Sequence, residues 1–153
     1  MSPEQRLLEL GLELPAALPP NGTYVPYRVV GSMLYLSGHG PRLPDNTYRL
    51  GRLDSLEQAS AAYEDARLTA LNMLASIKLA LGDLSRVEAI VKLLGMVHAT
   101  SSFKNHSRVI DGCSDLLVSI FGEKGLHARS AVGMSSLPHG MTVEIEAIIQ
   151  IRE

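Results

Sequence analysis

The stretch RVEAIVKLLGMVH, residues 86–98, constrains the fold of this chain more than any other. Its residues alternate as in a β-strand, yet both alternating sets are apolar. A strand of this kind is normally covered on both faces of its sheet. One set is Val87, Ala89, Val91, Leu93 and Val97, and the other is Ile90, Leu94 and Met96. Since one layer of helices covers only one face, the pattern predicts a partner subunit on the other.

Two long helices are predicted to form the covering layer. Residues 55–81 carry apolar side chains at helical spacing, and Ser55 and Gln58 have the spacing of a capping box. Residues 103–122 show a second apolar stripe of helical period. A shorter helix is expected over residues 3–12, ahead of a proline-rich break.

The remaining strands are predicted before the first and after the second of these two long helices in the sequence. Residues 24–37 suggest a hairpin that turns at Gly31-Ser32, and HARSAVGMSSLPHGMTVEIEAIIQI, residues 127–151, indicates two strands joined by a turn. The order β-β-α-β-α-β-β predicts an α+β fold, a mixed sheet with two helices on one face. We assign residues 1–20 to an N-terminal extension with a short helix, and residues 21–153 to a single domain.

Composition excludes several classes of function. The chain has 153 residues and a net charge of -2, so nothing favours binding to nucleic acid. No apolar run approaches the length of about 20 residues that spans a membrane, and the N-terminus lacks the pattern of a signal peptide. Cys113 is the single cysteine, and it falls in an apolar, helix-like run that predicts a buried thiol. These features predict a cytoplasmic protein.

The sequence holds no local pattern of a metal, phosphate or hydrolase site. Its five histidines are scattered singly, without the spacing of a zinc site. The glycines of the loop after residue 37 do not follow a phosphate-binding pattern, and no nucleophile elbow is present. We therefore expect no metal site.

Charged residues inside the last two predicted strands need an explanation, because charges are seldom buried without partners. Arg129 has small neighbours, which leave room for its guanidinium to hold a carboxylate through two parallel hydrogen bonds. Glu144 and Glu146 share one face of their strand, about 7 Å apart. One interpretation is a structural salt bridge across this hairpin, and the other is a site for a small carboxylate.

Three motifs resemble the reactive intermediate deaminase family, also known as Rid or YjgF-like and earlier as L-PSP endoribonucleases. The first is Ala-Arg-Ser-Ala-Val at 128–132, followed by Leu-Pro at 137–138 and Val-Glu-Ile-Glu-Ala at 143–147. The second is LYLSGHGP at 34–41, similar to the family's Ser-Gly-Gln-x-Pro turn. The third is ALNMLASIKLALGDLSRVEAIVKL at 70–93, similar to its asparagine-containing helix and the strand that follows.

This resemblance implies a fold like that of chorismate mutase, in a homotrimer with a central barrel and clefts between subunits. It also implies hydrolysis of 2-imino or 2-enamino acids to a 2-keto acid and ammonia, without a cofactor. Arg129 matches the arginine that grips the substrate carboxylate, and Glu144 matches the acid that positions the attacking water.

Other positions match residues that line the family's cleft. They are the backbone of Gly38 and Ala131, and a tyrosine that aligns best with Tyr24 and alternatively with Tyr27. His39 stands where glutamine is common, and Ala131 stands where many members have cysteine. We include His39 among the substrate-binding residues because it lies in the glycine-rich turn.

Two other functions use parts of the same pattern. A non-catalytic trimer that binds a small carboxylate, as a sensor or regulator, would need Arg129 but not Glu144. An endoribonuclease would need a basic path for RNA, and the chain offers only isolated arginines such as Arg28, Arg42 and Arg49.

Overall fold

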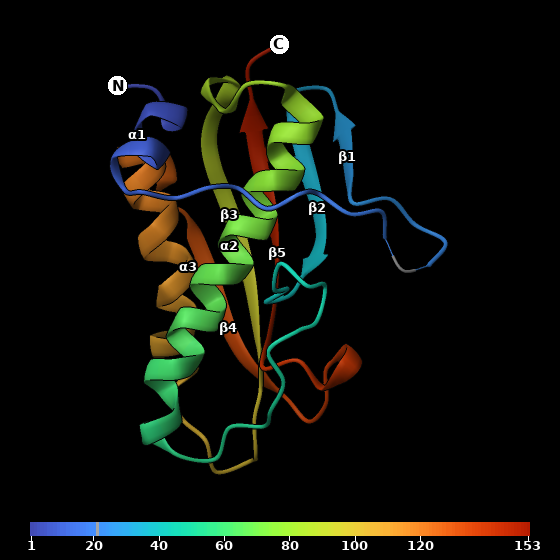
Figure 1. Ribbon diagram of the computed structural model, residues 1–153, viewed down its shortest axis with the longest axis vertical. Helices are drawn as coiled ribbons and strands as arrows, with labels where there is room; N and C mark the ends of the chain where they lie inside the picture. Colours follow the sequence, from blue (N-terminus) through green and yellow to red (C-terminus); the bar gives the residue numbers. More distant parts are fainter. Residues whose placement is uncertain (21) are drawn as a thin grey trace.

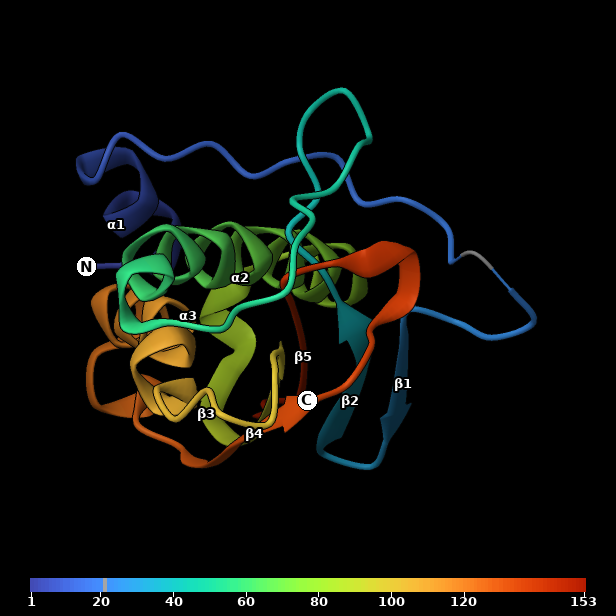
Figure 2. The ribbon, with the colours of Figure 1, turned by 90° about the horizontal axis from the view of Figure 1, so that it is seen from below.

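The computed structural model describes residues 1–20 and 22–153. They fold into one mixed sheet with the order β1-β2-β5-β3-β4 and helices packed on it. Figures 1 and 2 show α2 and α3 side by side on one face of this sheet. The helices are α1 (Pro3–Glu9), α2 (Ala59–Leu81) and α3 (His106–Phe121), and the strands are β1 (Tyr27–Val30), β2 (Met33–His39), β3 (Val87–His98), β4 (Ala128–Met134) and β5 (Val143–Ile151). The predicted α+β fold and its element order are confirmed.

Strand pairing corrects one prediction. The first hairpin turns as expected, with Val30 opposite Met33 and Gly31 at a φ of 59°. The last two strands, however, are not neighbours, because β3 lies between β4 and β5. Helix α3 connects β3 to β4, which therefore run parallel, whereas β5 pairs antiparallel with both β2 and β3. A salt bridge across a β4–β5 hairpin is thus excluded.

The hydrophobic core lies between the sheet and the two long helices. Leu93, Val97, Ile145 and Ile149 are fully buried there. The helices approach one another closely at Gly112, where a Cβ atom would collide with a backbone carbonyl of α2. Cys113 is also fully buried, and burial raises the pKa of its thiol to about 12, which confirms its predicted role as a small core residue.

The other face of the sheet is open in this chain and partly apolar. The pairing places Tyr35 and Val132 on it, and they are 43% and 38% exposed. The alternation predicted for β3 was wrong at three residues, since Ala89 pairs with the exposed Gln150, Ile90 is buried and Val91 is 38% exposed. Irregular pairing next to these residues shifts the alternation along the strand.

The N-terminal segment packs along the rest of the fold (Figure 1). Helix α1 ends at Glu9, earlier than predicted, and its Leu7 is buried. Oε1 of Glu4 accepts a hydrogen bond of 2.7 Å from the backbone N–H of Leu84 and lies 3.6 Å from the Lys78 ammonium. Residues 12–20 have no regular secondary structure, and the carbonyl of Ala16 accepts a hydrogen bond from Arg42 in the loop after β2.

Within the described residues, none of the helices has both the length and the apolar character that crossing a membrane requires.

Candidate functional site

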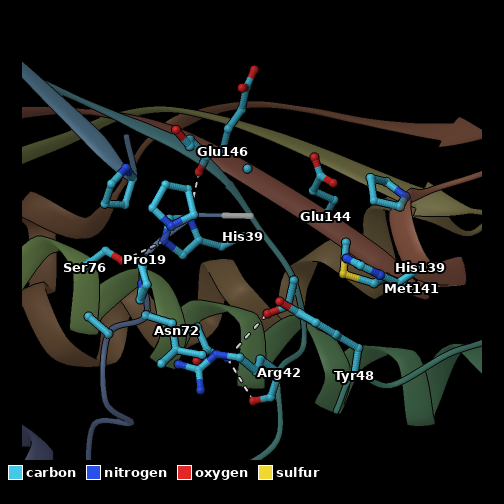
Figure 3. A pocket seen from close by; sticks show the side chains of 18 of the residues that line it. Pro19, His39, Arg42, Tyr48, Asn72, Ser76, His139, Met141, Glu144 and Glu146 are labelled. Atoms are coloured by element: carbon cyan, nitrogen blue, oxygen red, sulfur yellow. Dashed lines mark hydrogen bonds between the residues drawn. The ribbon is translucent and has the colours of Figure 1, made fainter. Parts of the chain in front are cut away.

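A cavity of about 840 Å³ lies where β2 ends, beside the start of β5 (Figure 3). Its walls come from the proline-rich segment 17–20, the loop after β2, one side of α2 and the approach to β5. Four of the predicted site residues line it, namely Tyr24, Gly38, His39 and Glu144. The alternative Tyr27 is not among its lining residues. The volume is within the range typical of ligand pockets.

Glu144 is the central acid of this cavity. It projects from β5 toward the open face of the sheet, opposite Met96 of β3. Its carboxylate lies directly over Gly38, where a Cβ atom would collide with Oε2. Burial raises the pKa of Glu144, and the like charge of Glu146 raises it further. The site therefore holds a carboxylate with more than ordinary affinity for a proton.

His39 lies in the cavity wall with both ring nitrogens bonded. Its Nδ1 is 2.6 Å from the carbonyl oxygen of Ser37, and its Nε2 is 2.7 Å from Oγ of Ser76 on α2. Because a carbonyl only accepts, Nδ1 carries the proton and Nε2 accepts from the Ser76 hydroxyl. Burial lowers the pKa of His39, which favours this neutral ring. His39 thus anchors the end of β2 to α2.

Arg42 is a cavity residue that the sequence did not single out for this site. Only 9% of its surface is exposed, and its guanidinium donates to Oδ1 of Asn46 at 3.1 Å and to the carbonyl of Ala16. On α2, the side-chain amide of Asn72 donates to the Arg42 carbonyl at 3.1 Å, which fixes the loop to the helix. No local pattern marks Arg42, since its burial depends on the N-terminal segment that crosses it.

An aromatic pair forms another part of the wall. The rings of Tyr48 and His139 stack with centroids 5.3 Å apart and an angle of 4° between their planes. His139 belongs to the turn before β5 and has a φ of 60°. Figure 3 shows His139 and Met141 beside Glu144, with Arg42 on the other side of the cavity. Glu144 and Arg42 thus lie on different sides of the same cavity.

Arg129 and Ala131 lie elsewhere, on the edge strand β4. Nη1 of Arg129 donates to Oδ1 of Asp111 at 2.8 Å and to Oγ of Ser114 at 2.9 Å, while Nη2 donates to Oγ of Ser107 at 2.6 Å. All three acceptors are on α3. The interpretation of Arg129 as part of a salt bridge with Glu144 or Glu146 is excluded, because β3 separates the two strands and Arg129 pairs with Asp111 on α3.

No group of three or more His, Cys, Asp or Glu side chains suited to a metal ion occurs within residues 1–20 and 22–153. The polar groups of the cavity are instead a carboxylate, a neutral imidazole and a guanidinium. This set is suited to an organic ligand that carries an anionic group and a centre that a water molecule attacks.

Residues 4–144 match the family described as "YjgF/chorismate mutase-like, putative endoribonuclease". Protein TCP17 of Trypanosoma cruzi is 40% identical over 146 residues, which cover 95% of this chain and 91% of that protein. A "putative endoribonuclease" structure from Shewanella oneidensis MR-1 superposes with a TM-score of 0.93 at 35% identity, over 99% of this chain and 100% of its own. RidA from Psychrobacter sp. PAMC 21119 gives a TM-score of 0.62 at 26% identity, over 88% and 94% of the two chains.

Proposed function

The chain belongs to the YjgF/chorismate mutase-like family, and we propose that it hydrolyses 2-imino acids, and the 2-enamino acids that tautomerise to them, to 2-keto acids and ammonia. The observation that carries this proposal is the half-buried carboxylate of Glu144, raised in pKa and lying over Gly38 in a cavity of ligand size. A general base works best when its pKa approaches the working pH.

In the proposed reaction, Glu144 takes a proton from water while the water oxygen bonds to the imine carbon. Glu144 returns this proton to the imine nitrogen, which gives a tetrahedral amino alcohol. The hydroxyl proton then passes by way of Glu144 to the amino group, the C–N bond breaks, ammonia leaves, and the former water oxygen becomes the carbonyl of the 2-keto acid. Because the imine carbon is already electrophilic, orientation of the substrate and of one water is the protein's main task.

Two features support roles for the other residues that line the cavity. The lack of a side chain at Gly38 lets a substrate approach the β2 backbone beside the Glu144 carboxylate. Tyr24 lies at the mouth of the cavity and is 53% exposed, so its ring is available to cover a bound substrate. His39 would contribute as a neutral wall residue.

We assign the substrate carboxylate to Arg129 of a neighbouring subunit in a homotrimer. Within one chain Arg129 and Ala131 lie apart from the cavity, so a shared site requires a second copy. The partly apolar open face, which includes Tyr35 and Val132, supports such an assembly because association would remove it from water. The small-molecule substrate would then bind in three equivalent clefts.

Carboxylate binding without catalysis is the second candidate. A protein of Lactococcus lactis described as a "putative regulator", 30% identical over 92% of this chain, favours it. The bonds of Arg129 to Asp111, Ser107 and Ser114 bear equally on both candidates, because each would use this guanidinium for a carboxylate. A regulator or sensor of this kind would use the same cavity and would not need Glu144 as a base.

A coupled assay tests the proposal. An amino-acid oxidase generates 2-imino acids in solution, and release of the 2-keto acid is compared with and without the protein. Glu144→Gln should reduce the acceleration about 10²–10⁴-fold, the usual contribution of a general base. Glu57→Gln is the matched control, because Glu57 is exposed at the start of the helical segment and does not line the cavity.

Absence of acceleration by the wild-type protein over a panel of imino acids would remove the enzymatic proposal. Full activity in Glu144→Gln would remove the role assigned to this residue.

A further inference from the structure

Arg42 is a buried cation with no anionic partner among residues 1–20 and 22–153. Its exposure is 9%, and both of its side-chain acceptors, Asn46 and the carbonyl of Ala16, are neutral. No salt bridge joins Arg42 to a carboxylate within residues 1–20 and 22–153, including Glu144 and Glu146 of the same cavity. Burying a charge is costly unless it is paired.

Arg42 lines the cavity and has donors that no acceptor within the described residues takes up. A guanidinium carries five N–H donors, and two are bonded within the described residues. The backbone behind it is fixed, because Asn72 holds the carbonyls of Gly40 and Arg42 against α2. A planar donor group held in this way matches the two oxygens of a carboxylate.

A purely structural role does not require this residue type. The contacts with Asn46 and Ala16 tie the proline-rich segment to the loop after β2, and a neutral donor would serve them as well. Arg129 is also partly buried, and there the carboxylate of Asp111 lies 2.8 Å from the guanidinium. Within residues 1–20 and 22–153, no acid pairs with Arg42 in this way.

The dimensions of the cavity fit a substrate longer than the smallest imino acid. Its volume of about 840 Å³ is near the upper end of the range for drug-sized ligands. Gly38, over which Glu144 lies, and Arg42 are four residues apart along the chain, a span of at most about 14 Å if fully extended. Since Glu144 and Arg42 both line this cavity, a substrate bound at Glu144 can carry a side chain directed toward Arg42.

We propose that Arg42 binds a second, distal carboxylate, so that the site selects 2-imino dicarboxylic acids over imino acids with neutral side chains. This proposal rests on the imine hydrolase function proposed above and defines its substrate class. The two carboxylates of the substrate would bind to different arginines. The carboxylate next to the imine would bind Arg129 of the neighbouring subunit, and the distal one would bind Arg42. Arg42 would set specificity without taking part in proton transfer.

The first test compares two imines of equal main-chain length, generated by oxidases from glutamate and from norvaline. The wild-type protein should have a kcat/KM at least about tenfold higher for the glutamate imine, because a charge-assisted pair discriminates strongly against an apolar group. Arg42→Gln should abolish this preference by lowering kcat/KM for the glutamate imine about 10–100-fold, with a change of less than about threefold for the norvaline imine.

Two further variants make this result specific. Arg42→Lys keeps the charge but not the planar fork, and should retain part of the preference. Arg6→Gln is the control, because Arg6 lies in α1 and forms only an exposed pair with Glu9. An unchanged preference in folded Arg42→Gln, or equal kcat/KM for both imines in the wild-type protein, would overturn the proposal and leave imine hydrolysis standing.

A binding experiment separates this proposal from the catalytic one. Calorimetric titration with 2-oxopentanedioate, the keto acid of glutamate, is compared with 2-oxopentanoate, the keto acid of norvaline. The dicarboxylate should bind the wild-type protein at least about tenfold more tightly, and Arg42→Gln should remove that difference. This result would support the Arg42 site even if no imine is hydrolysed, whereas equal affinities would overturn it.

Discussion

Arg129 and Arg42 are two arginines that the fold treats differently. The Arg129 side chain is 17% exposed and is paired with Asp111 inside its own chain. Arg42 is 9% exposed, and within the described residues it has only neutral acceptors. The first lies at the edge of the sheet against α3, and the second lies in a loop at the cavity of Glu144 (Figure 3). The difference between them is the carboxylate partner: a ligand would have to share Arg129 with Asp111, whereas Arg42 has no such competitor within the described residues.

A large effect on the rate is expected from Gly38→Ala, which tests whether the reaction occurs in the Arg42 cavity. The new Cβ would collide with the Glu144 carboxylate and displace it. We expect hydrolysis to fall about 10²-fold, because small misplacement of a catalytic group has effects of this size. Steady-state kinetics measure the change, and the melting temperature shows whether the fold is intact. Unchanged kinetics would show that the reaction does not occur in this cavity. Arg42 would then have no substrate to bind there, and the contrast with Arg129 would lose its functional meaning.

The next prediction compares how much replacement of each arginine lowers the stability of the fold. Arg129→Met leaves Asp111, Ser107 and Ser114 without their donor, and should lower the free energy of unfolding by about 1–3 kcal/mol. Arg42→Met removes two hydrogen bonds but also an unpaired buried charge, so its net cost should be below about 1 kcal/mol. Urea unfolding of the two variants measures both values.

Arg129→Met should also abolish hydrolysis if this side chain grips the substrate carboxylate from the neighbouring subunit. A stable and fully active variant would contradict both roles. A larger loss of stability in Arg42→Met than in Arg129→Met would reverse the comparison, since it would show that the loop depends on Arg42 more than the sheet edge depends on Arg129.

Sequence patterns predicted most elements of this fold because those elements depend on local periodicity. The hairpin turn at Gly31, the helix that ends at Leu81 and the alternation of β5 all follow from nearby residues. Which strands pair with one another does not follow from nearby residues. Because β4 pairs with β3 and not with β5, Arg129 contacts Asp111 of helix α3. Arg42 was overlooked as a site residue for the same reason, because a segment 26 positions away covers it.

A smaller effect is expected from Asp111→Asn, which makes Arg129 resemble Arg42 by removing its carboxylate. Asp111 is 47% exposed, so the free energy of unfolding should fall by no more than about 1 kcal/mol. Freed from this competitor, Arg129 should bind a substrate carboxylate more tightly, and KM for the norvaline imine should decrease. An increased KM would show that Asp111 positions Arg129 for the substrate rather than competing with it.

The smallest effect concerns the pH dependence of hydrolysis in the cavity, which Arg42, Glu144 and Glu146 all line. Glu144 must be ionised to accept a proton, and its pKa is raised by burial and then by the charge of Glu146. Glu146→Gln removes the second cause, so the pKa of Glu144 should fall and the acid limb of kcat/KM should move to lower pH. The control Glu57→Gln should leave the limb in place. An acid limb that stays fixed or moves to higher pH in Glu146→Gln would show that another group limits the rate at low pH.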